Sequence, residues 1–149
     1  MKLNNNKINM TFHHVGVAVK SISDTLPYYT GIFGFRQVSE IAAVPPQKVN
    51  VCFVEAPPGV LIELVEGAGA NSPVEKVLEK AGSGPYHICY KVEDLDEAIA
   101  ALRQEGCILF KRFELPAHGL RRFAFLLAPD RQLFELCESD KEKPREAAA

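Results

Sequence analysis

The sequence lacks an apolar run that approaches the roughly 20 residues of a membrane-spanning helix. Its first ten residues are polar and rich in asparagine, without the apolar stretch that a secretory signal peptide needs. A nucleic-acid surface would require a clustered basic excess, whereas the net charge is −2. We therefore expect a cytoplasmic protein with neither a membrane nor a nucleic acid among its partners.

CxxC spacing is also absent, so neither a zinc knuckle nor a redox motif is indicated. Each cysteine lies in an apolar, strand-like segment, where a free thiol behaves as a small hydrophobic group and a reducing compartment is expected. The chain of 149 residues is 47% hydrophobic, which is enough for one ordinary domain with a proper core. The four cysteines are Cys52, Cys89, Cys107 and Cys137.

Two short segments of the chain recur. Leu61–Glu66 reads LIELVE, and Leu133–Glu138 reads LFELCE. A second pair, His14–Val19 and His87–Val92, recurs at nearly the same offset along the chain. The chain therefore holds two copies of one unit, and each copy opens with a histidine and closes with a glutamate. Units too small to close their own core should pair with each other.

Each copy is predicted to hold a strand, a helix and three further strands. In the first copy Ser23 is the expected N-cap and Gly34 the expected stop of the helix. In the second copy Asp94 is the expected N-cap and Gly106 the stop. The predicted strands are 11–19, 35–41, 48–55 and 60–66 in the first copy and 86–92, 107–113, 121–127 and 132–138 in the second. The predicted helices are 24–33, a linking helix capped by Ser72, and the helix that follows Asp94.

We predict one domain over residues 11–138. Module one would span 11–68, a linker 69–85 and module two 86–138, with tails at 1–10 and 139–149. Because side chains alternate between the faces of a strand, the bulky apolar residues of both copies should share the face beneath the helices. These residues are Val15, Val17, Val19, Ile62, Leu64, Ile88, Tyr90, Val92, Phe134 and Leu136.

One histidine and one glutamate of each copy fall on the opposite face, among small neighbours. Taken singly, each would be interpreted as a core histidine or a strand-edge charge. Their shared face and their recurrence favour a four-ligand site for a divalent metal, since a carboxylate in an apolar hollow is costly unless paired or metal-bound. The predicted ligands are His14, Glu63, His87 and Glu135. His13 is interpreted as structural.

Over residues 11–138 this pattern resembles the vicinal oxygen chelate superfamily, which includes glyoxalase I, extradiol dioxygenases and bleomycin-resistance proteins. The resemblance implies an α+β fold in which two tandem βαβββ modules form a cupped mixed sheet. It also implies a metal held by a histidine on the first strand and a glutamate or glutamine on the last strand of each module, positions that match the four predicted ligands. The ion could be cobalt, nickel, manganese, zinc or iron.

Within that superfamily, the segment Ser72–Gly106 and the loop Ala117–Gly119 most resemble methylmalonyl-CoA epimerases. Such epimerases carry a second acid/base glutamate just ahead of the third strand, where this chain has Pro46. The final hairpin, Pro129–Gln132, is shorter than theirs and is more similar to the glyoxalase and resistance-protein turn.

The resemblance therefore implies a metal-dependent isomerase that abstracts a proton beside a chelated thioester or carbonyl. Glu135 would be one base, and Gln47, Glu63 or a water would be the second proton carrier. Two alternatives stay open, a lyase of the glyoxalase I (lactoylglutathione lyase) type and a non-catalytic binding protein of the resistance type. An extradiol dioxygenase is disfavoured, because it binds iron through two histidines and a single glutamate.

The expected partners are a small-molecule substrate, which could be a CoA thioester, and a second copy of the chain. Four basic residues could meet CoA phosphates, although solvated surface charge is the simpler interpretation. They are Lys111, Arg112, Arg121 and Arg122. A homodimer is expected because exposed strand edges invite pairing.

Overall fold

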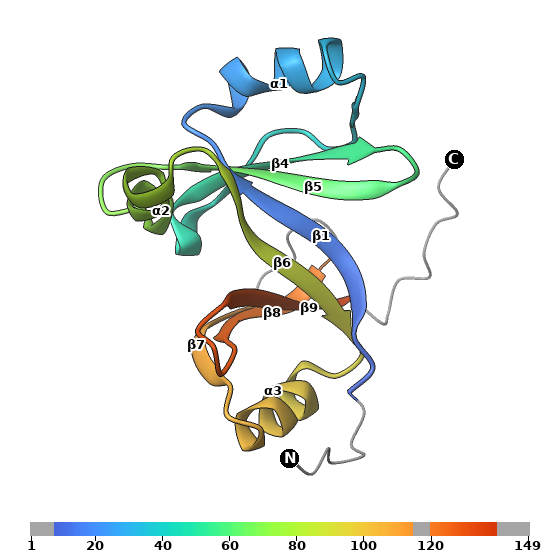
Figure 1. Cartoon of the computed structure of the whole chain (residues 1–149), viewed down its shortest axis with the longest axis vertical. Helices are drawn as coiled ribbons and strands as arrows, with labels where there is room; N and C mark the ends of the chain where they lie inside the picture. Colours follow the sequence, from blue (N-terminus) through green and yellow to red (C-terminus); the bar gives the residue numbers. More distant parts are fainter. Residues whose placement is uncertain (1–7, 115–119, 140–149) are drawn as a thin grey trace. The chain divides into compact units, whose positions relative to one another are not determined.

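The computed structural model describes residues 8–114 and 120–139, which hold nine strands, three α-helices and one 3-10 helix (Figure 1). Most of the two predicted tails and the loop Ala117–Gly119 lie outside these residues. The chain divides into two compact units, residues 13–88 (the N-terminal unit) and residues 1–12 with 89–149 (the C-terminal unit). The predicted module boundaries stay predictions. No described helix is long and apolar enough to cross a membrane.

The N-terminal unit is built on a mixed sheet. Its strand order is β2-β4-β5-β1-β6, and β3 also pairs with β4. β1 and β5 are parallel, whereas β4 is antiparallel to β5, β2 and β3. The strands are β1 (Thr11–Ala18), β2 (Arg36–Gln37), β3 (Ala42–Val44), β4 (Val49–Ala56), β5 (Val60–Gly67) and the first part of β6 (Gly84–Val92).

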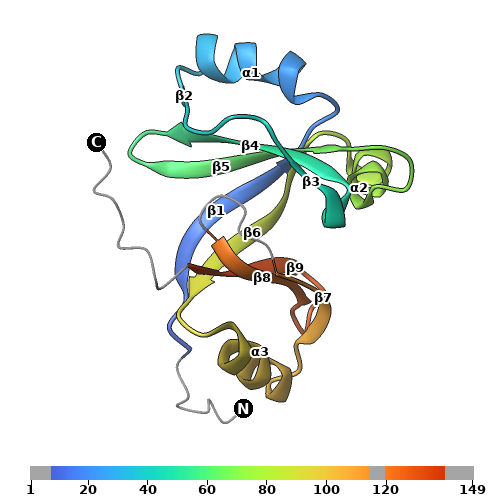
Figure 2. The ribbon, with the colours of Figure 1, turned by 180° about the vertical axis from the view of Figure 1, so that it is seen from behind.

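Helix α1 (Ile22–Gly31) covers one face of this sheet, lying across β4 and β5 (Figure 2). The predicted N-cap, Ser23, is wrong: Ser21 is the cap, because it is extended and its side chain accepts a hydrogen bond from the amide of Asp24. The predicted division of the faces is confirmed here, since β1 and β5 contribute the expected residues to the core beneath α1. That core contains Val17, Val19, Ile22, Cys52, Val54 and Leu64.

The predicted strand over 35–41 is wrong. The segment instead forms the two-residue strand β2, a bend and then β3, followed by a 3-10 helix at Pro45–Gln47. The cause is Ser39, whose hydroxyl accepts a hydrogen bond from the amide of Phe53 at 2.8 Å. The side-chain amide of Gln37 also donates to the carbonyl of Ser39. Side-chain bonds therefore replace the backbone ladder at this point.

The linking helix is confirmed as α2 (Pro73–Ala81), with Ser72 as N-cap accepting from the amide of Val74. The C-terminal unit has the strand order β6-β9-β8-β7. Its strands besides β6 are β7 (Ile108–Glu114), β8 (Leu120–Leu127) and β9 (Leu133–Ser139).

Helix α3 (Leu95–Gln104) begins after Asp94, whose side chain accepts from the amide of Glu97 as predicted. It lies against β8 and β9, and the core beneath it contains Val92, Leu95, Ala98, Ile99, Ala124, Leu126 and Leu136. Tyr90 and Phe134 pack against this core as expected. Ile88 is an exception at 40% exposed, because the β6 residues that α3 covers are Tyr90 and Val92.

Candidate metal centre

Three predicted ligands meet within the N-terminal unit. His14 lies on β1, Glu63 on β5 and His87 on β6. In the parallel ladder between β1 and β5, Gly16 stands opposite Glu63, so the glutamate lies one step beyond His14 along the same face. His14 and His87 are 0% and 4% exposed, and the Glu63 side chain is 14% exposed. All three are therefore withdrawn from bulk water.

Their ligand atoms form a nearly equilateral triangle. Nε2 of His14 and Nε2 of His87 are 3.4 Å apart, and they lie 3.6 and 3.7 Å from Oε1 of Glu63. A point equidistant from three atoms so spaced lies about 2.1 Å from each, which is the bond length of zinc to imidazole nitrogen or carboxylate oxygen. The spacing and the donor types therefore fit a divalent ion.

Gly16 provides the space for His87. A β-carbon built on Gly16 would overlap the imidazole ring of His87, far inside the 3.0 Å that such contacts essentially never reach. At position 16 the space between β1 and the His87 ring on β6 therefore admits no side chain larger than the hydrogen atom of glycine. The small residue that the sequence places beside His14 therefore sets where the second histidine ring can lie.

His13 also contacts the site, although the sequence interpretation assigned it a structural role. Its Nδ1 lies 2.8 Å from Nδ1 of His14, and the two rings meet edge to face. Neighbours along a strand normally point to opposite faces, so alternation gave no signal for this contact. A pair of adjacent histidines at a predicted ligand position is the only sequence feature that could have suggested it.

The chain as a whole is similar to proteins of one known superfamily. Residues 13–125 match the Glyoxalase/Bleomycin resistance protein/Dioxygenase superfamily. The chain belongs to this superfamily. Its α+β fold is that of the superfamily, and the fold class drawn from the resemblance is confirmed. The second half has the βαβββ order, whereas the first half has one further short strand, because β2 and β3 are separate.

Among relatives in the superfamily, the uncharacterized protein YqjC of Bacillus subtilis is 36% identical over 127 residues, covering 84% of this chain and 89% of that protein. The ethylmalonyl-CoA/methylmalonyl-CoA epimerase of Cereibacter sphaeroides is 33% identical over 110 residues, covering 72% and 81%. A variant of the Streptomyces coelicolor methylmalonyl-CoA epimerase, solved with 2-nitronate-propionyl-CoA, is 26% identical with a TM-score of 0.75, covering 88% of this chain and 99% of that one.

The fourth predicted ligand, Glu135, belongs to the C-terminal unit. It lies on β9 opposite Phe125 and is 5% exposed. Burial raises the pKa of the Cys89 thiol far above its ordinary value, and the adjacent Cys137 and Glu135 raise it further. Without a bound cation, Cys89 is therefore a neutral thiol. A role for Glu135 as metal ligand and base stays a prediction.

This chain has Pro46 where the epimerases that it resembles carry their second acid/base glutamate. Pro46 lies in the 3-10 helix Pro45–Gln47, and Lys48 follows in a left-handed conformation with φ 55°. The whole segment from Ala42 to Val54 contains no acidic residue. No carboxylate of this segment can therefore take over the role.

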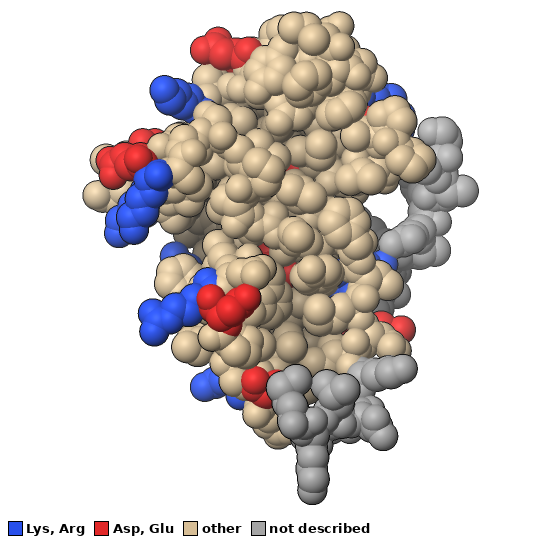
Figure 3. Space-filling model, viewed as in Figure 1, with Lys and Arg blue, Asp and Glu red and all other residues tan. Residues whose placement is uncertain are grey.

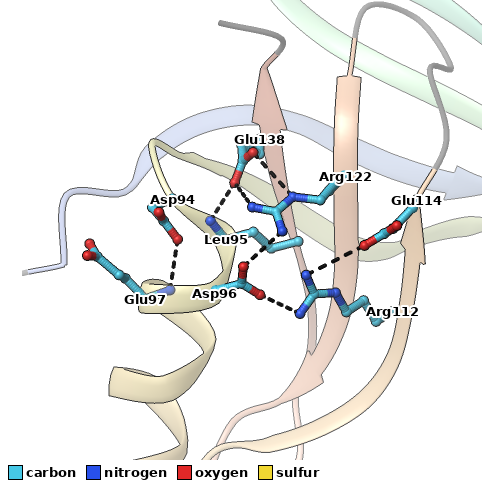
Figure 4. Close-up of polar contacts among 8 residues, drawn as sticks. All are labelled: Asp94, Leu95, Asp96, Glu97, Arg112, Glu114, Arg122 and Glu138. Atoms are coloured by element: carbon cyan, nitrogen blue, oxygen red, sulfur yellow. Dashed lines mark hydrogen bonds and ion pairs between the residues drawn. The ribbon is translucent and has the colours of Figure 1, made fainter.

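Two of the basic residues that could meet CoA phosphates, Arg112 and Arg122, form ion pairs within the C-terminal unit (Figure 4), whereas the side chain of Arg121 lies outside the described residues. Arg112 and Arg122 both pair with Asp96, at 2.6 and 2.9 Å, and Arg122 also pairs with Glu138 at 2.7 Å. The pKa of Asp96 is lowered, mainly by Arg122 and then by Arg112. The Lys111 ammonium lies 5.1 Å from the centre of a phenylalanine ring.

On the face drawn in Figure 3, the described charged side chains lie in small groups of mixed sign. A site for a polyanion would require several cations without acidic neighbours. The contacts of Arg112 and Arg122 therefore favour the simpler interpretation, in which these residues stabilise the fold.

Proposed function

We propose that this chain is a divalent-metal-dependent epimerase that acts on a CoA thioester of the methylmalonyl-CoA type. The observation that carries the proposal is the triangle of His14, Glu63 and His87 ligand atoms in a chain 33% identical to an epimerase. The ligand of the Streptomyces structure, 2-nitronate-propionyl-CoA, supports a CoA thioester as the substrate class.

In this proposal His14, Glu63, His87 and Glu135 hold the ion. The assignment of Glu135 rests on the repeat, since it has the same place in LFELCE as Glu63 has in LIELVE. When bound, the ion would act as a Lewis acid that stabilises negative charge on a substrate carbonyl oxygen.

Epimerisation removes the proton between the thioester carbonyl and the carboxylate, then returns a proton to the opposite face of that carbon. Two proton carriers are therefore needed. Glu135 is proposed as one of them. The second is Glu63 or a water; Gln47 has no basic group and could serve only by orienting that water. A lactoylglutathione lyase type of reaction would need a single base.

The proposal predicts exchange of the C2 proton of methylmalonyl-CoA with deuterated solvent, together with inversion at C2. Glu135→Gln should lower both rates by about 10²-fold or more, because it removes a proton carrier. Glu55→Gln is the control, since Glu55 pairs with Arg36 at the surface. The measurement is NMR of the exchange and chiral analysis of the product, with metal content determined for each variant.

Each alternative has its own result. Exchange without inversion would mean a one-base enzyme with a different natural substrate. Neither exchange nor inversion in a metal-loaded sample would contradict the epimerase and favour the lyase or the binding role. If Glu135→Gln keeps full exchange, Glu135 is not the base.

We also propose a homodimer. In the C-terminal unit β7 ends the strand order, and its Ile108 and Phe110 are 60% and 65% exposed. An exposed apolar edge strand favours pairing with another chain. Light scattering at micromolar concentration should therefore give twice the chain mass, and Phe110→Lys should give monomers. A monomeric wild-type protein would refute the dimer, and a dimeric Phe110→Lys variant would exclude this edge.

A further inference from the structure

The two ring nitrogens of His14 have different surroundings in the N-terminal unit. Nε2 faces the ligand triangle, at 3.6 Å from Glu63 and 3.4 Å from His87. Nδ1 lies 2.8 Å from Nδ1 of His13, which is a hydrogen-bond distance. His14 thus has one nitrogen for an ion and one for a neighbouring histidine.

Two neutral imidazole nitrogens at this distance share a single hydrogen, so one donates and the other accepts. Coordination at Nε2 of His14 requires a free lone pair on that atom, which places the hydrogen of His14 on Nδ1. Nδ1–H of His14 then donates to Nδ1 of His13, and His13 carries its own hydrogen on Nε2. The opposite direction, with His13 as donor, would place the hydrogen of His14 on Nε2, so only the arrangement with His14 as donor leaves Nε2 open to a metal.

We propose that His13 is a positioning residue of the metal centre, which orients the His14 ring and keeps its Nε2 unprotonated. The inference rests on the metal site of the proposed function and is independent of the substrate. It gives His13 a role in ion affinity rather than the structural role that its sequence position suggested.

The second copy of the repeat has a different residue at the matching position. The residue before His87 is Tyr86, whose ring meets the imidazole of His87 edge to face with centroids 4.5 Å apart. A ring contact restricts orientation but does not select a tautomer. Because the two copies differ here, substitution of His13 should change the tautomer of His14 and leave that of His87 as it is.

Two substitutions distinguish the effect of the His13 Nδ1 acceptor from the effect of the His13 ring. His13→Phe keeps an aromatic ring against His14, whose centroid is 5.0 Å from that of His13, and removes the acceptor. His13→Asn removes the ring and places an amide oxygen on Cγ, where the histidine has Nδ1. Thr11→Val is the control, as an exposed change on the same strand.

The experiment measures the tautomer of His14 by ¹⁵N NMR in metal-free protein, and the dissociation constant for Co²⁺ by titration. Wild-type protein should carry the His14 hydrogen on Nδ1. His13→Phe should lose that preference and bind Co²⁺ about 10- to 100-fold more weakly. His13→Asn should restore the tautomer and most of the affinity, and Thr11→Val should match the wild type.

Unchanged Co²⁺ affinity and an unchanged His14 tautomer in His13→Phe would overturn the proposal. So would a folded His13→Asn variant as weak as His13→Phe, because the ring rather than the nitrogen would then matter. If wild-type protein binds no Co²⁺ yet His13→Phe shifts the tautomer as expected, the metal-dependent function fails while the orientation of His14 by His13 stands.

Discussion

Gly16→Ala is expected to weaken divalent-metal binding by roughly 100-fold or more, because it removes the place of one ligand. The new methyl group would occupy the position of the His87 imidazole, which must then leave the ligand triangle. The overlap is also expected to lower the free energy of unfolding by about 1–3 kcal/mol, the usual cost of overpacking. Isothermal titration with Co²⁺ or Zn²⁺ and denaturant unfolding measure the two effects.

Gly31→Ala is the matched control, since a β-carbon there meets nothing within 4 Å. It should leave metal affinity unchanged and, because Gly31 is in helix α1, should raise the free energy of unfolding by at most about 1 kcal/mol, the opposite sign to Gly16→Ala. A double variant, Gly16→Ala with His87→Ala, identifies the cause: the methyl group would enter the space that the ring leaves, so the two unfolding effects should fall short of additivity by about 1 kcal/mol. Wild-type metal affinity in Gly16→Ala would show that the His87 ring can bind from another position.

Glu138→Gln is expected to lower the free energy of unfolding by about 2–4 kcal/mol at pH 7. Glu138 is 3% exposed and accepts two hydrogen bonds from the Arg122 guanidinium and one from the Leu95 amide, at the N-terminus of α3. The Glu138 carboxylate faces the Arg122 guanidinium (Figure 4), and a neutral amide in its place would leave the arginine partly uncompensated. Urea unfolding of both proteins measures the difference.

This difference should depend on pH. Burial is the largest influence on Glu138 and by itself raises the pKa of the carboxyl, but the hydrogen bonds from Arg122 and Leu95 together outweigh it, so the pKa is lowered from the ordinary value of 4.5. A depressed folded-state pKa contributes stability that is present above the unfolded value and is lost as pH falls through the folded value. The gap between wild type and Glu138→Gln should therefore be constant near pH 7 and shrink below about pH 4.5.

Glu66→Gln provides the matched comparison from the first copy. Glu66 accepts hydrogen bonds from the Ile22 amide at the start of α1 and from the side-chain amide of Asn50. Both donors are neutral amides, from which a glutamine oxygen also accepts, so a loss of only about 1 kcal/mol is expected. Equal losses in Glu66→Gln and Glu138→Gln, or a gap that widens in acid, would contradict the role assigned to Arg122.

The two glutamates of each repeat thus face different environments. Glu63 and Glu66 are three residues apart on β5, and side chains at odd spacing point to opposite faces of a strand. The first faces the ligand triangle, and the second binds the first turn of α1. In β9, Glu138 binds the first turn of α3 in the same way. The last strand of each copy, β5 or β9, therefore binds the first turn of its helix through its second glutamate, Glu66 or Glu138. That glutamate lies on the face of the strand opposite to Glu63 or Glu135.

The sequence by itself determined the features that local rules govern. The repeat, the caps Ser72 and Asp94, and the face on which His14, Glu63 and His87 lie could all be predicted, because capping and alternation depend on residues a few positions apart. These rules also indicated which faces the helices cover. They failed where a side chain from a distant segment intervenes, as at Ser39, whose bond to the Phe53 amide ends β2.

Only the tertiary structure decided distances between strands that are far apart in the sequence. The 3.4 Å between the Nε2 atoms of His14 and His87, and the contact that requires glycine at position 16, depend on which strands become neighbours and in which register. The alternation of side chains along a strand assigns each residue to a face of the sheet but does not give its distance from a residue on another strand. For the same reason His13 was interpreted as structural: its 2.8 Å contact with His14 depends on side-chain rotamers that packing selects, and no pattern in the chain encodes them.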